Sequence, residues 1–339
     1  MTWTAWRQQR SLVIAMVVAA AVVALFLVVI GRQENEVWRG FLASPCNGSQ
    51  VSTASGNICE SRFQSVLGAG HFNVMAMAIG VLLGPIFGSI LGVNAVAREV
   101  EVGTTRLAWT QSFSRTRWLM SKFVVNGAIL VVTLGTLCAV YGWWIKVAHY
   151  SARISPTGFP IAGFLPLVYG VVAFTIVVLL GLVLRHAGWS LVAGLLLTAV
   201  LVFVVEHEVR PILASPHFAV VSSTQVSLGS SSGFYSSGGV PSNSWAIGGG
   251  VAPSGIKTTP SSHTMEVSSN DLYSCMASPR GQTRDGSAYC MRHLRLEHVG
   301  LFVPDSDFWY LQFSEYGIYL AFAFCLAAGA NVRLRMMLA

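Results

Sequence analysis

The residues whose types and spacing best suit a function form one run, Ala97–Trp118, which reads AREVEVGTTRLAWTQSFSRTRW. Gly103 predicts the end of one helix, and Thr104 predicts the N-cap of a short second helix. The second helix would present Leu107 and Trp109 on an apolar face surrounded by charged residues. Such a face is typical of a helix that docks into a groove on a partner protein. We therefore expect this run to bind a cytoplasmic partner.

A second group of ionisable residues comprises Glu206, His207 and Glu208. A metal site needs three or four converging ligands, and the spacing of these residues does not predict convergence. We interpret their side chains as solvated or salt-bridged, with a metal site as the alternative. Because they follow an apolar stretch, they are also candidates for an outer gate.

The sequence contains no G-x-x-x-x-G-K followed by Ser or Thr, the loop that binds nucleotide phosphates. A membrane-embedded hydrolase would need ionisable residues inside apolar stretches, and the apolar stretches of this sequence hold almost none. We expect that the chain is not an enzyme and holds no metal or cofactor of its own.

The composition indicates that the elements which position these residues lie in a membrane. The sequence is 53% hydrophobic and only 10% charged, whereas soluble domains carry about 25% charged residues. Apolar residues concentrate in blocks of about twenty, the length of a membrane-spanning helix. We predict an all-α polytopic membrane protein with six spans: Leu12–Ile30, Phe72–Val96, Phe123–Ile145, Ile161–Leu184, Ala187–Val205 and Tyr316–Val332.

Two features of these spans need separate interpretation. The first span is too long for the apolar region of a signal peptide, and no small-residue cleavage site follows it. We interpret it as an uncleaved helix, with a cleaved signal peptide as the alternative. Between the fourth and fifth spans, Arg185 and His186 predict a very tight break.

The distribution of basic residues orients the spans. With both termini cytoplasmic, the inner segments are 1–11, 97–122, 185–186 and 333–339, and the outer segments are 31–70, 146–160 and 206–315. The inner segments hold ten of the 21 basic residues but only two of the 14 acidic residues. This bias is the positive-inside signature of membrane proteins, so the basic balance gives no reason to expect nucleic acid.

Three parts of the chain follow from this topology. Residues 1–205 hold the first five spans, with an extracellular loop at 31–70 and a cytoplasmic loop at 97–122. Residues 206–315 form a large extracellular region between the fifth and sixth spans. Its Ser- and Gly-rich composition favours a flexible or β-rich lobe. Residues 316–339 hold the sixth span and a cytoplasmic tail.

The six cysteines divide by location. Cys138 and Cys325 fall inside spans, where we expect them to serve packing. The other four lie in outer segments, where an oxidising environment favours disulfides. A metal site is the alternative, but neither pair has the C-x-x-C spacing of zinc ligands. The predicted disulfides are Cys46 with Cys59 and Cys275 with Cys290.

Small residues recur every four positions in two spans and would let helix backbones approach closely. They serve either packing inside one subunit or a subunit or gating interface. The ladders consist of Ala76, Gly80, Gly84, Gly88 and Gly92 in the second span and of Gly317, Ala321, Cys325 and Gly329 in the sixth.

The run Ala97–Trp118 resembles the cytoplasmic loop of the permease subunits of type-2 ABC exporters, especially the actinobacterial group. The segments TAWRQQR and DFWYLQFSEYGIYLAF also resemble the termini of that family. The region 206–315 is long for the family. The resemblance implies a coupling helix that contacts an ATPase, with these transmission residues: Arg98, Glu99, Glu101, Gly103, Thr104, Arg106, Leu107 and Trp109.

The resemblance also implies what the chain works with. A separate P-loop ATPase subunit, in two copies, would bind ATP and Mg, and a second permease copy or paralogue would complete the transporter. The complex would lie in the lipid of a bacterial plasma membrane and export a drug, lipid or peptide by alternating access.

Two other functions are alternatives. The chain could be a membrane-anchored sensor or adhesion protein whose extracellular lobe binds a ligand, in which case the isolated lobe should bind without any ATPase. A membrane enzyme that processes metal or lipid is the third alternative.

Overall fold

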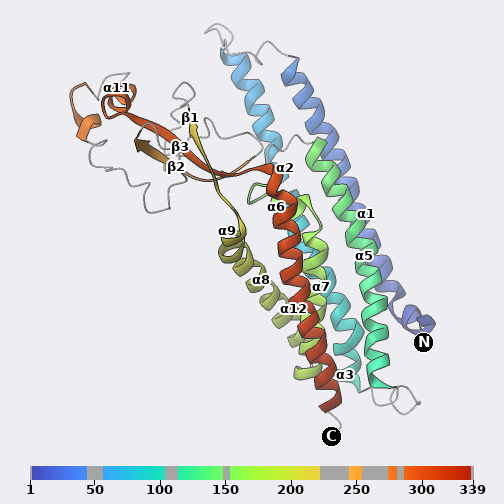
Figure 1. Cartoon of the computed structure of the whole chain (residues 1–339). Coiled ribbons are helices and arrows are strands. Elements are labelled where there is room, and N and C mark those ends of the chain that lie inside the picture. The colour runs from blue at the N-terminus through green and yellow to red at the C-terminus, as the bar shows by residue number, and fades with distance from the viewer. Residues whose placement is uncertain are drawn as a thin grey trace. The chain divides into compact units, whose positions relative to one another are not determined.

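The structure is a computed structural model (Figure 1), and it describes residues 2–43, 56–103, 114–147, 153–221, 244–253, 274–280 and 286–336. The chain forms two compact units. The first, which we call the helical unit, comprises Met1–Tyr150, Thr157–Pro211 and Tyr310–Ala339. The second, which we call the sheet unit, comprises Ser151–Pro156 and Ile212–Trp309.

Long apolar helices dominate the helical unit, and short helices adjoin them. The helix bounds are α1 Thr2–Leu42, α2 Gly56–Gly92, α3 Arg98–Val102, α5 Arg115–Val147, α6 Phe159–Ala162, α7 Leu165–Leu184, α8 Ala187–Val204, α9 Arg210–Leu213 and α12 Phe308–Met336. Two π-helical turns join consecutive helices without a break: η2 Val93–Ala97 between α2 and α3, and η3 Val205–Val209 between α8 and α9.

Within the described residues, six helices are long and apolar enough to cross a membrane, and they confirm the predicted all-α polytopic fold. In hydrocarbon a helix satisfies every backbone hydrogen bond within itself, which is why apolar runs of this length form helices. The six spans are Arg10–Gly40, Val74–Val102, Thr116–Val147, Leu165–Leu184, Ala187–Leu213 and Asp305–Met336.

Several helices extend beyond the predicted spans. α1 continues to Leu42 instead of ending near Ile30. The helix of the fifth span continues past Val205 to Leu213, and α12 begins at Phe308. Hydropathy marks where apolar side chains stop, whereas the backbone stays helical for as long as its hydrogen bonds are satisfied within the helix. Parts of the predicted outer segments are therefore helical.

The core of the helical unit lies between α1, α2, α5 and α7. Trp144 and Tyr141 of α5 are buried there, and their rings meet edge to face with centroids 6.2 Å apart. The hydroxyl of Tyr141 donates a hydrogen bond of 2.8 Å to the carbonyl oxygen of Ala76 in α2. The large aromatic side chains of α5 therefore hold α5 against α2.

The ladder of small residues in α2 lies against α7. A Cβ atom on Gly84 would overlap the carbonyl oxygen of Pro166, and a Cβ atom on Gly88 would overlap that of Gly170. Only glycine allows two helix backbones to approach this closely. These contacts lie within one subunit, as the first interpretation of the ladder requires.

The ladder of α12 has different surroundings. A Cβ atom added to Gly317 or Gly329 would meet no described atom within 4 Å. Ala321 and Cys325 are exposed. The small residues of α12 therefore make no close helix contact within the described part of the helical unit.

A two-residue break separates α7 from α8, as the sequence predicted. Arg185 adopts the left-handed conformation with a φ of 54°, and its N–H donates to the carbonyl oxygen of Gly181. His186 is extended and serves as the N-cap of α8. Figure 1 shows that α3, the start of α1 and the end of α12 lie at one end of the helical unit, and that α8 leads from this end to α9.

Three antiparallel strands form the sheet unit: β1 His217–Val221, β2 Trp245–Pro253 and β3 Leu296–Val303, in the order β1-β3-β2. In this register Ala219 and Gly249 both lie opposite Gly300. The unit also contains α11 Gly286–His293 and the 3-10 turn η5 Asp305–Asp307. This sheet gives structure to a region whose composition favoured a flexible or β-rich lobe.

Candidate functional site

The predicted partner-binding run begins on a helix that is continuous with the second span. η2 carries α2 into α3, and a Cβ atom on Gly181 of α7 would lie 2.7 Å from the Cβ of Ala97. α3 ends at Val102, and Gly103 follows with a φ of 79°. Glycine adopts this left-handed conformation without the steric cost that a Cβ atom brings. The predicted helix stop at Gly103 is confirmed.

Glu99 of α3 forms an ion pair with Lys122 of α5. The Nζ atom of Lys122 lies 2.6 Å from Oε1 of Glu99, and their side chains are 8% and 23% exposed, respectively. Because both side chains are mostly shielded from water, the attraction is screened less than at an open surface. The pair joins the two helices that flank residues 104–113.

Glu101 connects α3 to a different helix. Its Oε2 accepts a hydrogen bond of 2.9 Å from the backbone N–H of Ala187, at the start of α8. Its Oε1 lies 3.9 Å from Nδ1 of His186. Helix N-termini have unpaired N–H groups and a partial positive charge, so a carboxylate is favourable there. Glu101 therefore links α3 to the break between α7 and α8.

The structure describes half of the predicted transmission residues. Glu99 and Glu101 contact α5 and α8, Gly103 ends α3, and Arg98 is exposed. The predicted short helix lies outside the described residues, as do its residues Thr104, Arg106, Leu107 and Trp109. We define the α3 junction as Glu99, Glu101, Lys122 and the start of α8 at Ala187.

A second polar cluster lies at the other end of the helical unit, around Arg210. The Nε atom of Arg210 lies 2.6 Å from Oε1 of Glu315, and Nη1 lies 3.1 Å from Oε1 of Glu206. The guanidinium carbon lies 4.5 Å from the ring centroid of Phe159. The side chain of Arg210 is 2% exposed and that of Glu315 is not exposed. We call Arg210, Glu206 and Glu315 the Arg210 cluster.

Gln312 and Tyr316 extend this cluster on α12. Nε2 of Gln312 donates 2.8 Å to the carbonyl oxygen of Phe159, and Tyr316 donates to Oε1 of Gln312. The N–H of Phe164 donates 2.7 Å to the hydroxyl of Tyr316. A side chain at Gly163 would collide with Gln312 and Tyr316. The short helix α6 and the start of α7 are thus tied to α12.

The predicted gate residues have different positions. Glu206 belongs to the Arg210 cluster, whereas His207 stacks on Phe203 with ring centroids 4.2 Å apart, and Glu208 is exposed. The predicted gate at the end of the fifth span did not include Glu315. The apolar blocks themselves hold almost no ionisable residues, and Arg210 and Glu315 lie where the helices continue past those blocks.

One local signal could have found part of this cluster. Glu206 and Arg210 are four residues apart, the spacing at which side chains meet on one helix face. No local signal points to Glu315, which lies 105 residues from Arg210 along the chain.

Among the described residues, no three His, Cys, Asp or Glu side chains are close enough to hold a metal ion. In the sheet unit, Arg153 donates through Nε and Nη2 to the carboxylate of Asp305 at 2.7 and 2.8 Å. Nε2 of His217 lies 3.9 Å from Oδ2 of Asp307. The polar side chains there form pairs with one another.

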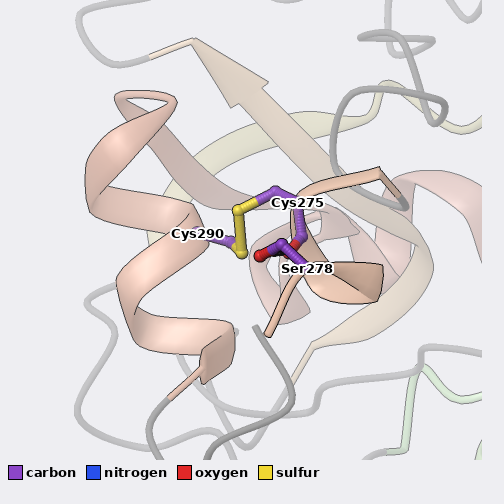
Figure 2. The surroundings of a disulfide bond; sticks show 3 residues. All are labelled: Cys275, Ser278 and Cys290. Carbon is purple, nitrogen blue, oxygen red and sulfur yellow. Dashed lines mark hydrogen bonds between the residues drawn. A yellow bond between two sulfur atoms is a disulfide. The ribbon is translucent and has the colours of Figure 1, made fainter. Parts of the chain in front are cut away.

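Cys275 and Cys290 form a disulfide in the sheet unit, as Figure 2 shows. Cys290 is buried in α11, and the hydroxyl of Ser278 donates a hydrogen bond to the carbonyl oxygen of Cys275. The second predicted disulfide, Cys46 with Cys59, lies outside the residues whose side chains are described. Cys138 is buried in α5, where the sequence predicted a packing role, and Cys325 is exposed on α12.

Comparison with known proteins identifies a family. Residues 15–210, more than half of the chain, match the family model described as ABC-2 membrane transporter related. No curated protein and no solved structure matches the chain. The match runs from within the first span to within the fifth and includes the α3 junction and Arg210. The chain therefore belongs to the ABC-2 membrane transporter related family, whose members are the membrane-spanning permease subunits of ABC transporters.

Proposed function

We propose that this chain is the permease of an ABC exporter, and that residues 104–113 form the coupling helix that receives force from an ATPase subunit. The observation that carries this proposal is the α3 junction. Both acidic side chains of α3 are used to hold other spans, Glu99 on α5 and Glu101 on α8. A surface helix that served only as a connector would have no need for these contacts.

The junction supports a mechanical role for residues 104–113. α3 precedes this segment and α5 follows it, and the pair of Glu99 with Lys122 fixes one helix to the other at the base of the segment. Movement of the segment would therefore move α3 and α5 together. Glu101 would pass the same movement to α8 at its N-terminus. Because α2 is continuous with α3, four helices would respond as one body.

In this mechanism the α3 end of the helical unit faces the cytoplasm of a bacterium, and the Arg210 end faces the exterior. Two ATPase subunits bind ATP and Mg, and a second permease copy or paralogue completes the pathway. Closure of the ATPases pushes the coupling helices, and the spans rearrange to open the outer side. The Arg210 cluster joins α6, α9 and α12, so we propose it as the outer gate that separates in that step.

The experiment purifies the tagged chain from native membranes with the P-loop ATPase that accompanies it and measures ATP hydrolysis in lipid nanodiscs. We expect Leu107→Ala and Trp109→Ala to lose the ATPase during purification. Glu99→Gln and Lys122→Met should keep the ATPase bound. The stimulation of ATP hydrolysis by the permease should be roughly fivefold smaller in these variants than in wild type, since site-to-site coupling is typically 1–3 kcal/mol. Arg117→Gln, which changes an exposed charge near Lys122, is the control.

Exchange of the paired charges gives a more specific test. The double variant with Glu99→Lys and Lys122→Glu should recover much of the stimulation that either single change loses, because the attraction is restored in reverse. The proposed function is refuted if no P-loop ATPase accompanies the wild-type chain. It is also refuted if residues 104–113 react with impermeant reagents on intact cells.

A further inference from the structure

One charged side chain near the end of α1 differs from its neighbours. The last three turns of α1 carry Arg32, Glu34, Glu36 and Arg39. Three of these are exposed, but Glu34 is only 8% exposed. Among the described residues, neither carboxylate oxygen of Glu34 has a hydrogen-bond partner. A buried carboxylate without a partner is costly, and in membrane proteins such a group indicates a functional site.

Two indole rings of α5 approach α1 one helical turn before Glu34. Gly31 precedes it by one helical turn on the same face of α1, and a Cβ atom there would lie 3.1 Å from Cδ1 of Trp144 and 3.5 Å from Cζ3 of Trp143. Residues three apart on a helix are neighbours, so Glu34 lies one helical turn from the point where both indole rings of α5 approach α1. Nε1 of Trp144, the ring atom bonded to Cδ1, is also buried and has no hydrogen-bond partner in the described part of the chain.

The unpaired carboxylate of Glu34 indicates which kind of ligand group could bind there. A proton would neutralise the carboxylate but would leave its O–H without an acceptor, and a water molecule would leave the charge uncompensated. An organic cation compensates the charge, and its apolar body packs on the partly exposed indole of Trp143, because indole faces attract cations.

We infer that Glu34, with Trp143, binds the cationic group of the transported substrate, which is a lipophilic organic monocation. This inference names the substrate class and so rests on the proposed export function. The site lies between α1 and α5, and α5 is the helix that Lys122 ties to the α3 junction. Movement of that junction would therefore reach the wall of the binding site.

The test measures binding of radiolabelled tetraphenylphosphonium to the purified full-length chain in detergent, without an ATPase. Tetraphenylborate, an anion of the same shape, is the matched probe. Wild type should bind the cation in preference to the anion. Glu34→Gln should bind the cation roughly tenfold more weakly, and Trp143→Leu a few-fold more weakly, because each removes one attraction. Glu36→Gln, which neutralises the exposed neighbour, should bind as wild type does.

Misfolding of the variants should not account for weaker cation binding. Glu34→Gln removes an unpaired buried charge, so the variant should resist thermal unfolding at least as well as wild type. Trp143 is 40% exposed, so its replacement gives a second folded variant. Equal binding of cation and anion by wild type overturns the inference, as does unchanged cation binding by Glu34→Gln. Because no ATPase is present, cation binding tests the site even if no ATPase accompanies the chain.

Discussion

Replacement of Arg210 by Met removes one partner of the buried ion pair and leaves the other in place. Glu315 has no exposed surface, and its Oε1 lies 2.6 Å from Nε of Arg210. A methionine side chain retains much of the apolar stem of arginine, so the change removes the charge and its hydrogen bonds while preserving much of the packing. The carboxylate of Glu315 then remains among apolar helices without a positive partner.

The burial of the pair sets the expected loss in the free energy of unfolding. Removing one partner of a buried ion pair costs about 3–5 kcal/mol in the free energy of unfolding. The pair with Glu206 adds at most about 1 kcal/mol, because exposed carboxylates are screened by water and this side chain is 28% exposed. The contact with Phe159 adds up to about 2 kcal/mol. These contributions share one guanidinium and do not simply add, so we expect Arg210→Met to cost about 4 kcal/mol.

The assay is unfolding in mixed micelles with increasing SDS, followed by the loss of helical circular dichroism. A double-mutant cycle with Glu315→Leu separates the pair from its surroundings. Each single variant removes one member of the pair and leaves the other in place, whereas the double variant removes both. We expect a coupling free energy of about 3 kcal/mol between the two positions. Arg335→Met, an exposed arginine of α12, should change the free energy of unfolding by less than about 0.5 kcal/mol.

Two results would contradict this reasoning. If Arg210→Met lowers the free energy of unfolding by less than about 1 kcal/mol, the pair behaves as an exposed one. If the effects of the two single changes add in the double variant, Arg210 and Glu315 do not act on each other.

Two further predictions concern packing and the sheet unit. Gly84→Ala and Gly88→Ala should each lower the free energy of unfolding by about 3 kcal/mol in the same SDS assay, since a Cβ atom would overlap backbone carbonyl groups of α7; Gly127→Ala, which has open space, should have little effect, and equal behaviour of all three variants would contradict the α2–α7 contact. Thiol labelling of the purified chain should modify Cys275 and Cys290 only after reduction, and Cys275→Ser should make Cys290 reactive without reductant; labelling of the unreduced wild-type pair would contradict the disulfide.

Local patterns in the sequence predicted several features correctly, because each depends on a short stretch of chain. Apolar blocks of about twenty residues predict spans whatever their neighbours are. Gly103 ends α3 because glycine tolerates the left-handed conformation, and Arg185 with His186 breaks the chain between two apolar blocks. The ends of the helices were predicted less well, because polar residues can continue a helix whose backbone is satisfied internally.

The sequence could not show which of the two ladders of small residues contacts another helix. Both have the four-residue period that permits close approach of helices. Gly84 and Gly88 pack against α7, whereas Gly317 and Gly329 have no described atom within 4 Å of an added Cβ. The four-residue period shows that one face of a helix consists of small residues. The arrangement of the other helices decides whether another helix packs on that face.

Composition and local spacing were enough to predict a membrane environment, the number of spans, and the run of residues that resembles a coupling loop. The pairing of charges depends instead on how the helices pack. Glu99 and Lys122 are 23 residues apart, and Arg210 and Glu315 are 105 residues apart. Such pairs depend on the rotation and axial position of packed helices, which no local pattern encodes. The α3 junction and the Arg210 cluster are therefore products of the packing of the whole helical unit.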